Sequence, residues 1–299
     1  FIAEMQHNGL QNTVYTNEIN NIDDINEEER DEESSFHQNT INCSLSVFPD
    51  GSYGKEGYDK YLQTKEDKDS YDNKLLVTDV NNQLKRYLDS GSSRLNQLKS
   101  LSIKYYNIIK SIMDDNNNRN TFIYSGHHVK QSGAVYLTKL IELVSGYKLL
   151  NKPVYNKDMF FNKNNKKKRC ILLTSQSSAY NTNFIELFND PRNINGEYIK
   201  IVIGTEIISE GVSFKNVQLI HVVEPWWNFS ETDQAIARAI RATSHNDLIR
   251  KNINFEKNRD VDIYLHCAIP VNDEKIPLYD ISIDQKMYIR SGIKDKSIK

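Results

Sequence analysis

The sequence predicts an α/β fold: a parallel sheet with helices on both faces, preceded by a region of helices and irregular chain. The first observation is an alternation, beginning at Thr121, of short apolar runs with segments of helical periodicity. The second is that these runs are apolar throughout, which is typical of strands buried on both faces of a parallel sheet. Residues 1–120 lack this alternation. We therefore expect a helical and irregular region over 1–120 and an α/β unit over 121–299.

The region over 1–120 contains few elements that the sequence alone defines. Residues 5–16 are compatible with a short helix. The stretch 18–39 is acidic, polar and without periodicity, so we expect a disordered acidic loop there. Residues 48–58 are rich in turn-forming and aromatic residues. From Ser93 to Ile112, apolar residues recur at three- and four-residue steps, which predicts one helix that ends in the polar run 114–120.

Strands and helices alternate in the expected α/β unit. The apolar runs predict strands at 121–125, 168–174, 198–205, 216–224 and 261–269. Helices are expected over 131–145, 183–189 and 230–242. Gly146 directly follows the first of them, in a position where glycine often ends a helix. Ser230 and Asp233 have the spacing of a capping box at the start of the last one.

Composition excludes several classes of protein. No apolar stretch approaches the roughly 18–20 residues of a membrane-spanning helix, so we expect no membrane partner. The three cysteines (Cys43, Cys170 and Cys267) are far apart and form no CxxC pair, so neither a disulfide scaffold nor a metal site is predicted. The formal charge is −2 over 299 residues, but residues 23–33 carry eight acids and one arginine. The rest of the chain is therefore mildly basic, which is compatible with binding nucleic acid.

Small polar residues follow three of the expected strands. They are Ser125-Gly126, Thr174-Ser175 and Gly204-Thr205. The carboxyl ends of parallel strands meet at one edge of a sheet, where ligands gather. Hydroxyl groups and exposed backbone N–H groups suit phosphate oxygens, so the three turns predict a phosphate-binding edge. Turn residues are also usual at strand ends without any ligand.

The expected helix over 230–242 carries two arginines and a glutamine on one face. Gln234, Arg238 and Arg241 lie at positions i, i+4 and i+7. The two arginines have no carboxylate at i±3 or i±4 between them, so they repel each other unless an anion lies nearby. Guanidinium groups bind phosphoryl oxygens well, and a triphosphate would supply that anion. Ion pairs with acids elsewhere in the fold are an equally open interpretation.

Several of these segments together resemble a known family. The run Gly204–Phe214, then Pro225-Trp226-Trp227-Asn228, then Gln234, Arg238, Arg241 and Ser244-His245 resemble motifs V and VI of superfamily 2 helicases. The Phe122–Ser125 strand followed by Gly133 resembles motif IV. The resemblance is closest to the branch of the nucleocytoplasmic large DNA viruses, which includes giant-virus members, the poxvirus early transcription factor small subunit and nucleoside triphosphate phosphohydrolase I. It implies the RecA-like C-terminal lobe of a two-lobe ATP-driven motor.

The resemblance also implies roles for single residues. Arg241 matches the arginine finger that stabilises charge on the γ-phosphate, with Arg238 as its neighbour in the same role. The matches near the nucleotide are Gln234, Gly211 and Ser213. The matches facing the backbone of nucleic acid are Ser125, Gly126 and Thr205, and Thr174 and Ser175 are expected on the same edge. Ala237 stands where relatives usually have glycine, and Ser213 where Asp or Asn is common.

Two parts of such a motor are absent from the sequence. A P-loop requires GxxxxGK[ST], and Gly54-Lys55 has neither the first glycine nor the final hydroxyl residue. The residues Asp31-Glu32-Glu33-Ser34 imitate a DExH motif, but no apolar strand precedes them. The resemblance therefore implies that ATP and Mg²⁺ are held mainly by an N-terminal RecA-like lobe of the same protein. We expect the 299 residues alone not to hydrolyse ATP.

Two other functions stay open. A Snf2-type DNA translocase also carries a proline-tryptophan-asparagine step and a Gln…Arg…Arg helix. A non-catalytic scaffold of a viral transcription complex would use the acidic segment to bind basic partners. The expected partners are nucleic acid (DNA in preference to RNA), the N-terminal lobe and viral transcription machinery. The viral resemblance implies a location in the host cytoplasm, viral factory or virion.

Overall fold

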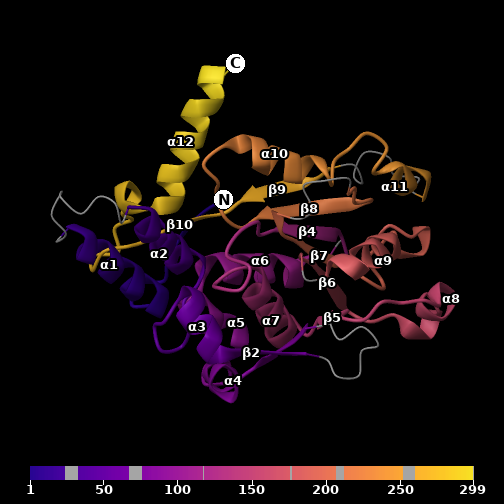
Figure 1. Ribbon diagram of the computed structural model, residues 1–299, viewed down its shortest axis with the longest axis horizontal. Helices are drawn as coiled ribbons and strands as arrows, with labels where there is room; N and C mark the ends of the chain where they lie inside the picture. Colours follow the sequence, from indigo (N-terminus) through magenta and orange to yellow (C-terminus); the bar gives the residue numbers. More distant parts are fainter. Residues whose placement is uncertain are drawn as a thin grey trace.

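The computed structural model describes residues 1–23, 33–66, 76–116, 118–175, 177–206, 212–251 and 260–298 (Figure 1). Its strands are β1 (Ile2–Glu4), β2 (Leu62–Glu66), β3 (Leu76–Val80), β4 (Asn120–Tyr124), β5 (Lys148–Leu149), β6 (Arg169–Leu173), β7 (Ile201–Gly204), β8 (Val217–Val222), β9 (Asp262–Leu265) and β10 (Cys267–Ile269). Its helices are α1 (Leu10–Asp23), α2 (Glu33–Leu45), α3 (Gly54–Tyr61), α4 (Asn82–Asp89), α5 (Arg94–Leu101), α6 (Ile103–Asp114), α7 (Ala134–Ser145), α8 (Lys157–Phe160), α9 (Ser178–Phe188), α10 (Phe229–Ala237), α11 (Asn246–Lys251) and α12 (Ile283–Ile298).

A six-stranded parallel sheet lies at the centre, in the order β5-β6-β7-β4-β8-β9. The last residues of its central strands lie side by side, because Tyr124 of β4 pairs with Gly204 of β7 and with Val222 of β8. Leu173 of β6 also pairs with Gly204. The carboxyl ends of these strands therefore form one continuous edge.

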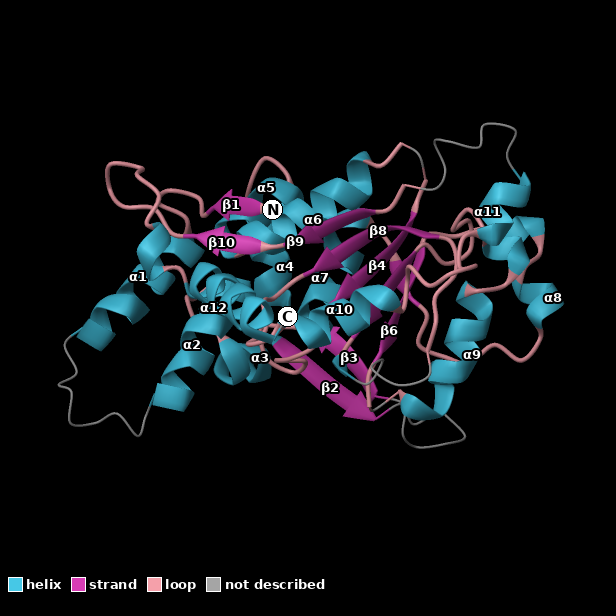
Figure 2. Ribbon diagram, turned by 90° about the horizontal axis from the view of Figure 1, so that it is seen from above, coloured by secondary structure: helices cyan, strands magenta, loops and turns pink. Residues whose placement is uncertain are grey.

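Helices cover both faces of this sheet (Figures 1 and 2). Successive side chains of a strand point to opposite faces, so Ile123 joins a hydrophobic cluster with α7 and the N-terminal helices. Phe122 and Tyr124 join a second cluster, to which α9 and α10 contribute. The predicted α/β architecture, with a parallel sheet covered on both faces, is confirmed. It is the arrangement of a RecA-like lobe.

The helix expected from Ser93 to Ile112 is in fact two helices, and that prediction was wrong at Ser102. The Ser102 hydroxyl accepts the N–H of Tyr105 at the start of α6 and donates to the carbonyl of Leu45 at 2.5 Å. The apolar periodicity runs through this break because residues on both sides of it, such as Leu101 and Ile103, enter the same cluster.

The loop expected over 18–39 is helical at both ends, so its predicted bounds were too wide. Helix α1 continues to Asp23 and α2 begins at Glu33, while residues 24–32 lie outside the described part. The buried face of α1 is partly polar, which removes the apolar pattern of a helix. Gln11 and Asn12 are buried and donate hydrogen bonds to backbone carbonyls, Gln11 to that of Ser44 at 3.0 Å and Asn12 to that of Val271 at 2.9 Å.

The N-terminal strand lies beside a strand from the C-terminal part of the chain. Strand β1 pairs in parallel with β10, which continues the line of β9 beyond His266. Residues on both sides of the predicted boundary at 120/121, such as Leu45, Ile108, Tyr136 and Met287, share one hydrophobic cluster. The division into 1–120 and 121–299 stays a prediction.

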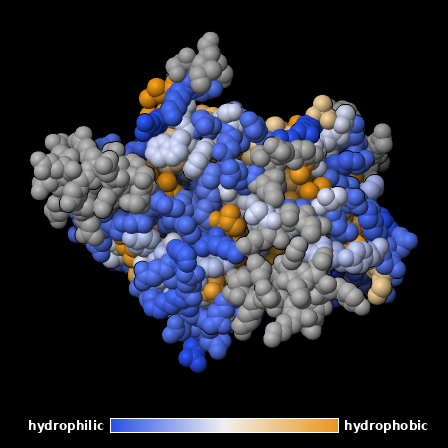
Figure 3. Space-filling model, in the orientation of Figure 1, coloured by the Kyte–Doolittle hydropathy of each residue, from blue (hydrophilic) through white to orange (hydrophobic). Residues whose placement is uncertain are grey.

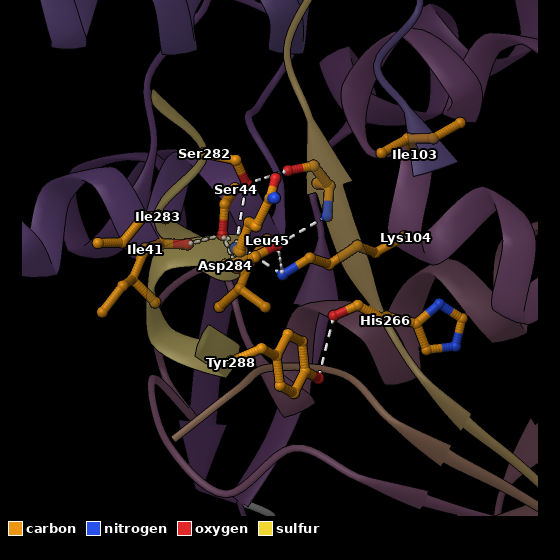
Figure 4. A network of polar contacts seen from close by, with 12 residues as sticks. Ile41, Ser44, Leu45, Ile103, Lys104, His266, Ser282, Ile283, Asp284 and Tyr288 are labelled. Atoms are coloured by element: carbon orange, nitrogen blue, oxygen red, sulfur yellow. Dashed lines mark hydrogen bonds and ion pairs between the residues drawn. The ribbon is translucent and has the colours of Figure 1, made fainter. Parts of the chain in front are cut away.

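A buried ion pair joins α12 to the N-terminal helices (Figure 4). The Nζ atom of Lys104 on α6 lies 2.6 Å from Oδ2 of Asp284 on α12, and both side chains are almost fully buried. The Asp284 carboxylate also accepts the hydroxyl of Ser44 at 3.0 Å and the N–H of Ala268 at 2.8 Å. One carboxylate thus connects α2, α6, β10 and α12.

The surface in the view of Figure 3 is mostly hydrophilic, with small separate hydrophobic spots. Among the described helices, none combines the length and the apolar character that a membrane crossing requires.

Candidate functional site

The edge at the carboxyl ends of β4, β6 and β7 brings together three turns that the sequence singled out. These strands are adjacent in the sheet. The N–H of Ser125 donates to the carbonyl of Gly204 at 3.0 Å, and the N–H of Thr205 donates to that of Leu173 at 3.2 Å. Backbone hydrogen bonds therefore hold Ser125, Thr174 and Thr205 at one place, as expected from the topology.

The hydroxyl groups on this edge differ in how they are used. The Thr205 hydroxyl is buried and donates to the carbonyl of Leu173 at 3.1 Å. Thr174 lies in a turn with Ser177, whose hydroxyl accepts the Thr174 N–H at 2.9 Å. Ser125 is fully buried, and its hydroxyl has no hydrogen-bond partner in the described part of the chain. Ser175 is exposed, so it presents its side chain to solvent without rearrangement.

Gly126 occupies a position with no room for a side chain. A Cβ atom there would lie 2.6 Å from the hydroxyl oxygen of Tyr124. That hydroxyl donates to Glu231 Oε1 at 2.7 Å, and His127 Nε2 lies 3.0 Å from the same carboxylate oxygen. The N–H of His127 donates to Glu224 Oε1 at 2.8 Å, and the imidazole stacks on Trp226 with ring centroids 3.4 Å apart. The turn after β4 is therefore fixed by α10 and by the segment before it.

The polar side chains predicted on one face of a helix over 230–242 do not all share that face, because the helix ends early. Helix α10 stops at Ala237, and the carbonyl of Arg238 accepts the N–H of Phe214 at 2.8 Å instead of continuing the helical pattern. Arg241 therefore does not share a helix face with Gln234, and that prediction was wrong. Gln234 instead lines a hollow of about 570 Å³ between α10 and α12, together with Asp233 and Lys294.

Arg241 lies beside Ser213, at the end of the sheet where β8 begins. Its Nη1 donates to the Ser213 hydroxyl at 2.6 Å, and the guanidinium is exposed. The Ser213 carbonyl accepts the side-chain amide of Asn189 at 2.8 Å, which holds this segment against α9. No carboxylate pairs with Arg241 in the described ranges. Gly211, the other predicted nucleotide contact here, lies outside the described residues.

Comparison with known proteins agrees with this geometry. Residues 108–243 match the family described as the helicase conserved C-terminal domain. The chain is 33% identical over 297 residues to a protein of Invertebrate iridescent virus 3 named as helicase 087L, covering 97% of this chain and 27% of that protein. It is 36% identical over 132 residues to a protein of Acanthamoeba polyphaga mimivirus named as ATP-dependent RNA helicase R563, covering 44% of this chain and 21% of that protein. The chain contains the C-terminal lobe of a superfamily 2 helicase of the large-DNA-virus type.

A solved structure supports the fold of this helicase lobe. The C-terminal part of the Fun30 ATPase domain aligns with a TM-score of 0.51 at 12% identity, covering 97% of this chain and 88% of that one. The chain spans about a quarter of the length of the curated relatives it matches (27% and 21%).

The sequence did not single out all the residues that shape this edge of the helicase lobe. Glu231 fixes both Tyr124 and His127, while Arg290 and Lys294 of α12 lie close to Trp226 and Trp227. Only the Trp-Trp pair left a visible signal in the sequence, since acids and lysines on exposed helices are common. Within the described ranges, no three His, Cys, Asp or Glu side chains are grouped to hold a metal ion.

The His127–Glu231 pair predicts a pH dependence for the stability of the helicase lobe. Burial alone would lower the pKa of His127, but the hydrogen bond to Glu231 and the charges of Glu224 and Glu206 outweigh it, so this pKa is raised. The hydrogen bond from His127 lowers the pKa of Glu231, with burial opposing it. The contribution of the pair is therefore complete between the ordinary pKa values of about 4.3 for Glu and about 6.5 for His.

This contribution decreases as the pH rises through the raised pKa of His127, and also as it falls through the lowered pKa of Glu231. We expect His127→Gln to lower the free energy of unfolding more at pH ~5.5 than at pH ~8.5. Urea unfolding of both proteins at the two pH values measures this. An equal loss at both would contradict the pairing.

Proposed function

We propose that this lobe supplies an arginine finger and a nucleic-acid contact surface to an ATP-dependent motor that moves along a nucleic acid strand. The observation that carries the proposal is the separation of two groups by the length of the parallel strands. Ser213 and Arg241 lie where β8 begins, whereas Ser125, Thr174 and Thr205 follow the carboxyl ends of their strands. A rigid sheet between the two groups would couple a change at the nucleotide phosphate to a movement at the nucleic acid strand.

Arg241 is the group proposed to stabilise charge on the γ-phosphate, with Arg238 proposed in the same role. Its exposure and its hydroxyl partner Ser213 support this role, because the guanidinium is held in place without a competing carboxylate in the described part. Ser213 and Gly211 would complete the contacts of this lobe with the nucleotide at this end of the sheet, whereas Gln234 lines the separate hollow between α10 and α12. ATP would be held mainly by an N-terminal RecA-like lobe of the same protein, together with Mg²⁺, which neutralises phosphate charge when bound.

The edge formed by Ser125, Gly126, Thr174, Ser175 and Thr205 is proposed to bind the backbone of the nucleic acid. The backbone N–H groups and hydroxyls there are of the kind that positions phosphates. The Thr205 hydroxyl would have to turn away from the carbonyl of Leu173 to reach a phosphate. We propose DNA as the track in preference to RNA, a role beside viral transcription machinery, and a location in the host cytoplasm, viral factory or virion.

The test compares ATP hydrolysis by the 299-residue chain with hydrolysis by the protein that joins it to the N-terminal lobe. We expect turnover, stimulated by nucleic acid, in the two-lobe protein and none in the chain alone. Hydrolysis by the chain alone would overturn the two-lobe arrangement. A two-lobe protein that neither hydrolyses ATP nor binds nucleic acid would favour a scaffold of a transcription complex, and translocation without strand separation would favour a Snf2-type motor.

A further inference from the structure

A cavity of about 1010 Å³ opens beside the carboxyl edge of the sheet. Five separate segments line it: α2, the turn after β4, the residue Glu206, the Trp226-Trp227 pair and α12. It adjoins the predicted strand-binding edge through Gly126, which belongs to both. None of the residues contributed by α2 or by α12 was expected from the sequence to bind a ligand.

The aromatic wall of this cavity is held rigidly. Trp226 stacks on His127 with an interplanar angle of 17°, and the N–H of His127 is bound to Glu224. Ser291 of α12 donates its hydroxyl to the carbonyl of Trp226. Both tryptophans are partly exposed. A flat aromatic surface therefore stays in place beside the opening.

Helix α12 contributes two cations to the same cavity. Arg290 and Lys294 are four residues apart, so they project from one face of the helix. The Arg290 guanidinium lies 5.3 Å from the centroid of the Trp227 ring, and this cation–π contact orients it. Glu206 lines the cavity as well, and its charge would repel a phosphate from that side. The polar side of the cavity that suits an anion is thus the α12 side.

We propose that this cavity binds a nucleotide of single-stranded nucleic acid, with its phosphates on Arg290 and Lys294 and its base against the Trp226-Trp227 surface. An aromatic face next to positive charge is the combination that binds single strands, since every base can stack and every nucleotide carries a phosphate. The inference rests on the proposed function, because it extends the same edge, but it assigns the contact to α12. Helix α12 is thereby a nucleic-acid-binding element of the lobe.

The first test measures binding of fluorescein-labelled oligothymidylate and oligouridylate to the 299-residue chain by anisotropy at several salt concentrations. We expect Arg290→Gln/Lys294→Gln to weaken binding about tenfold or more. The slope of log Kd against log salt should fall by about 1.4, because each phosphate contact to a single strand contributes about 0.7. The two oligonucleotides compare a thymidylate DNA strand with a uridylate RNA strand as ligands of the same site.

The matched control removes the same charge elsewhere. Lys296 is exposed on α12 but projects from the side opposite Lys294, and Lys85 is exposed on α4, at the other end of the molecule in Figure 1. We expect Lys85→Gln/Lys296→Gln to change Kd by less than about twofold, because neither residue lines the cavity. Equal weakening by both double variants would overturn the site, since it would mean that overall charge alone attracts the strand.

A second readout is available because the chain has two tryptophans and both line the cavity. Binding of unlabelled oligothymidylate should quench their fluorescence in the wild-type chain and not in Arg290→Gln/Lys294→Gln at the same concentrations. Binding of the oligonucleotide without any change in emission would overturn the α12 site and leave the proposed function standing. A wild-type chain that binds neither oligonucleotide would overturn both.

Discussion

Arg241→Ala in the two-lobe protein is expected to slow ATP hydrolysis by about 10³-fold or more, with little change in the KM for ATP. An arginine finger acts on charge that develops at the γ-phosphate during attack by water, so its removal affects the chemical step more than binding. The loss should be large because the guanidinium is held by the Ser213 hydroxyl at 2.6 Å and is not shared with a carboxylate of the described chain.

Two further variants distinguish the role of Arg241 in ATP hydrolysis from the general effect of removing an arginine side chain. Arg192→Ala removes the same side chain from a surface site, where it pairs with Asp190 and Asp158, and should leave hydrolysis within about twofold. Ser213→Ala keeps the guanidinium but removes its partner, so we expect a loss smaller than that of Arg241→Ala. Steady-state kinetics with saturating nucleic acid measures all three. An Arg241→Ala protein within about tenfold of wild type would show that the finger comes from elsewhere.

Asp284→Ala is expected to lower the free energy of unfolding by about 3–5 kcal/mol, because it leaves Lys104 charged, buried and unpaired. Lys104 and Asp284 are 1% and 0% exposed. The same change removes the acceptor for the Ser44 hydroxyl and for the N–H of Ala268. It therefore loosens the contact between the N-terminal helices and α12 (Figure 4). Urea unfolding at neutral pH, followed by circular dichroism, gives this free energy.

The control for this prediction is Lys110→Ala on the same helix, α6. Lys110 pairs with Asp114 on the surface, where their side chains are 46% and 61% exposed, so the expected loss is below about 1 kcal/mol. The double variant Lys104→Met/Asp284→Leu should recover part of the stability, because apolar side chains of similar volume need no charge partner, while the N–H of Ala268 stays without its acceptor. If the double variant is no more stable than Asp284→Ala, packing rather than the unpaired charge explains the loss.

The sheet was predictable because its inner strands, β4, β6, β7 and β8, are almost entirely buried. Such strands require continuous apolar runs, and each of the five runs from Thr121 to Ile269 contains a strand of the central sheet. Strand β5 has only two residues, Lys148 and Leu149, and is too short to leave such a run. The order of the strands in the sheet could not be predicted, since it depends on which strands pair once the chain has folded.

The ends of helices were less predictable than their existence. Ser102 interrupts a continuous apolar pattern because its hydroxyl finds the carbonyl of Leu45, and α10 ends at Ala237 because Phe214 donates to the carbonyl of Arg238. Both partners are more than 20 residues away in the chain (|i−j| = 57 for Ser102 and Leu45). Local periodicity carries no information about such contacts.

The candidate site likewise has parts that the sequence predicted and parts that only the tertiary structure shows. Sequence motifs alone indicated a helicase lobe, the polar strand ends and Arg241, because these depend on residue types at short spacings. Only the tertiary structure separated Gln234 from Arg241, brought Arg290 and Lys294 to the cavity beside Gly126, and joined Lys104 to Asp284. The last two of these arrangements depend on how α12 packs against distant parts of the chain, such as Trp226 (|i−j| = 65 from Ser291), which a linear pattern does not encode.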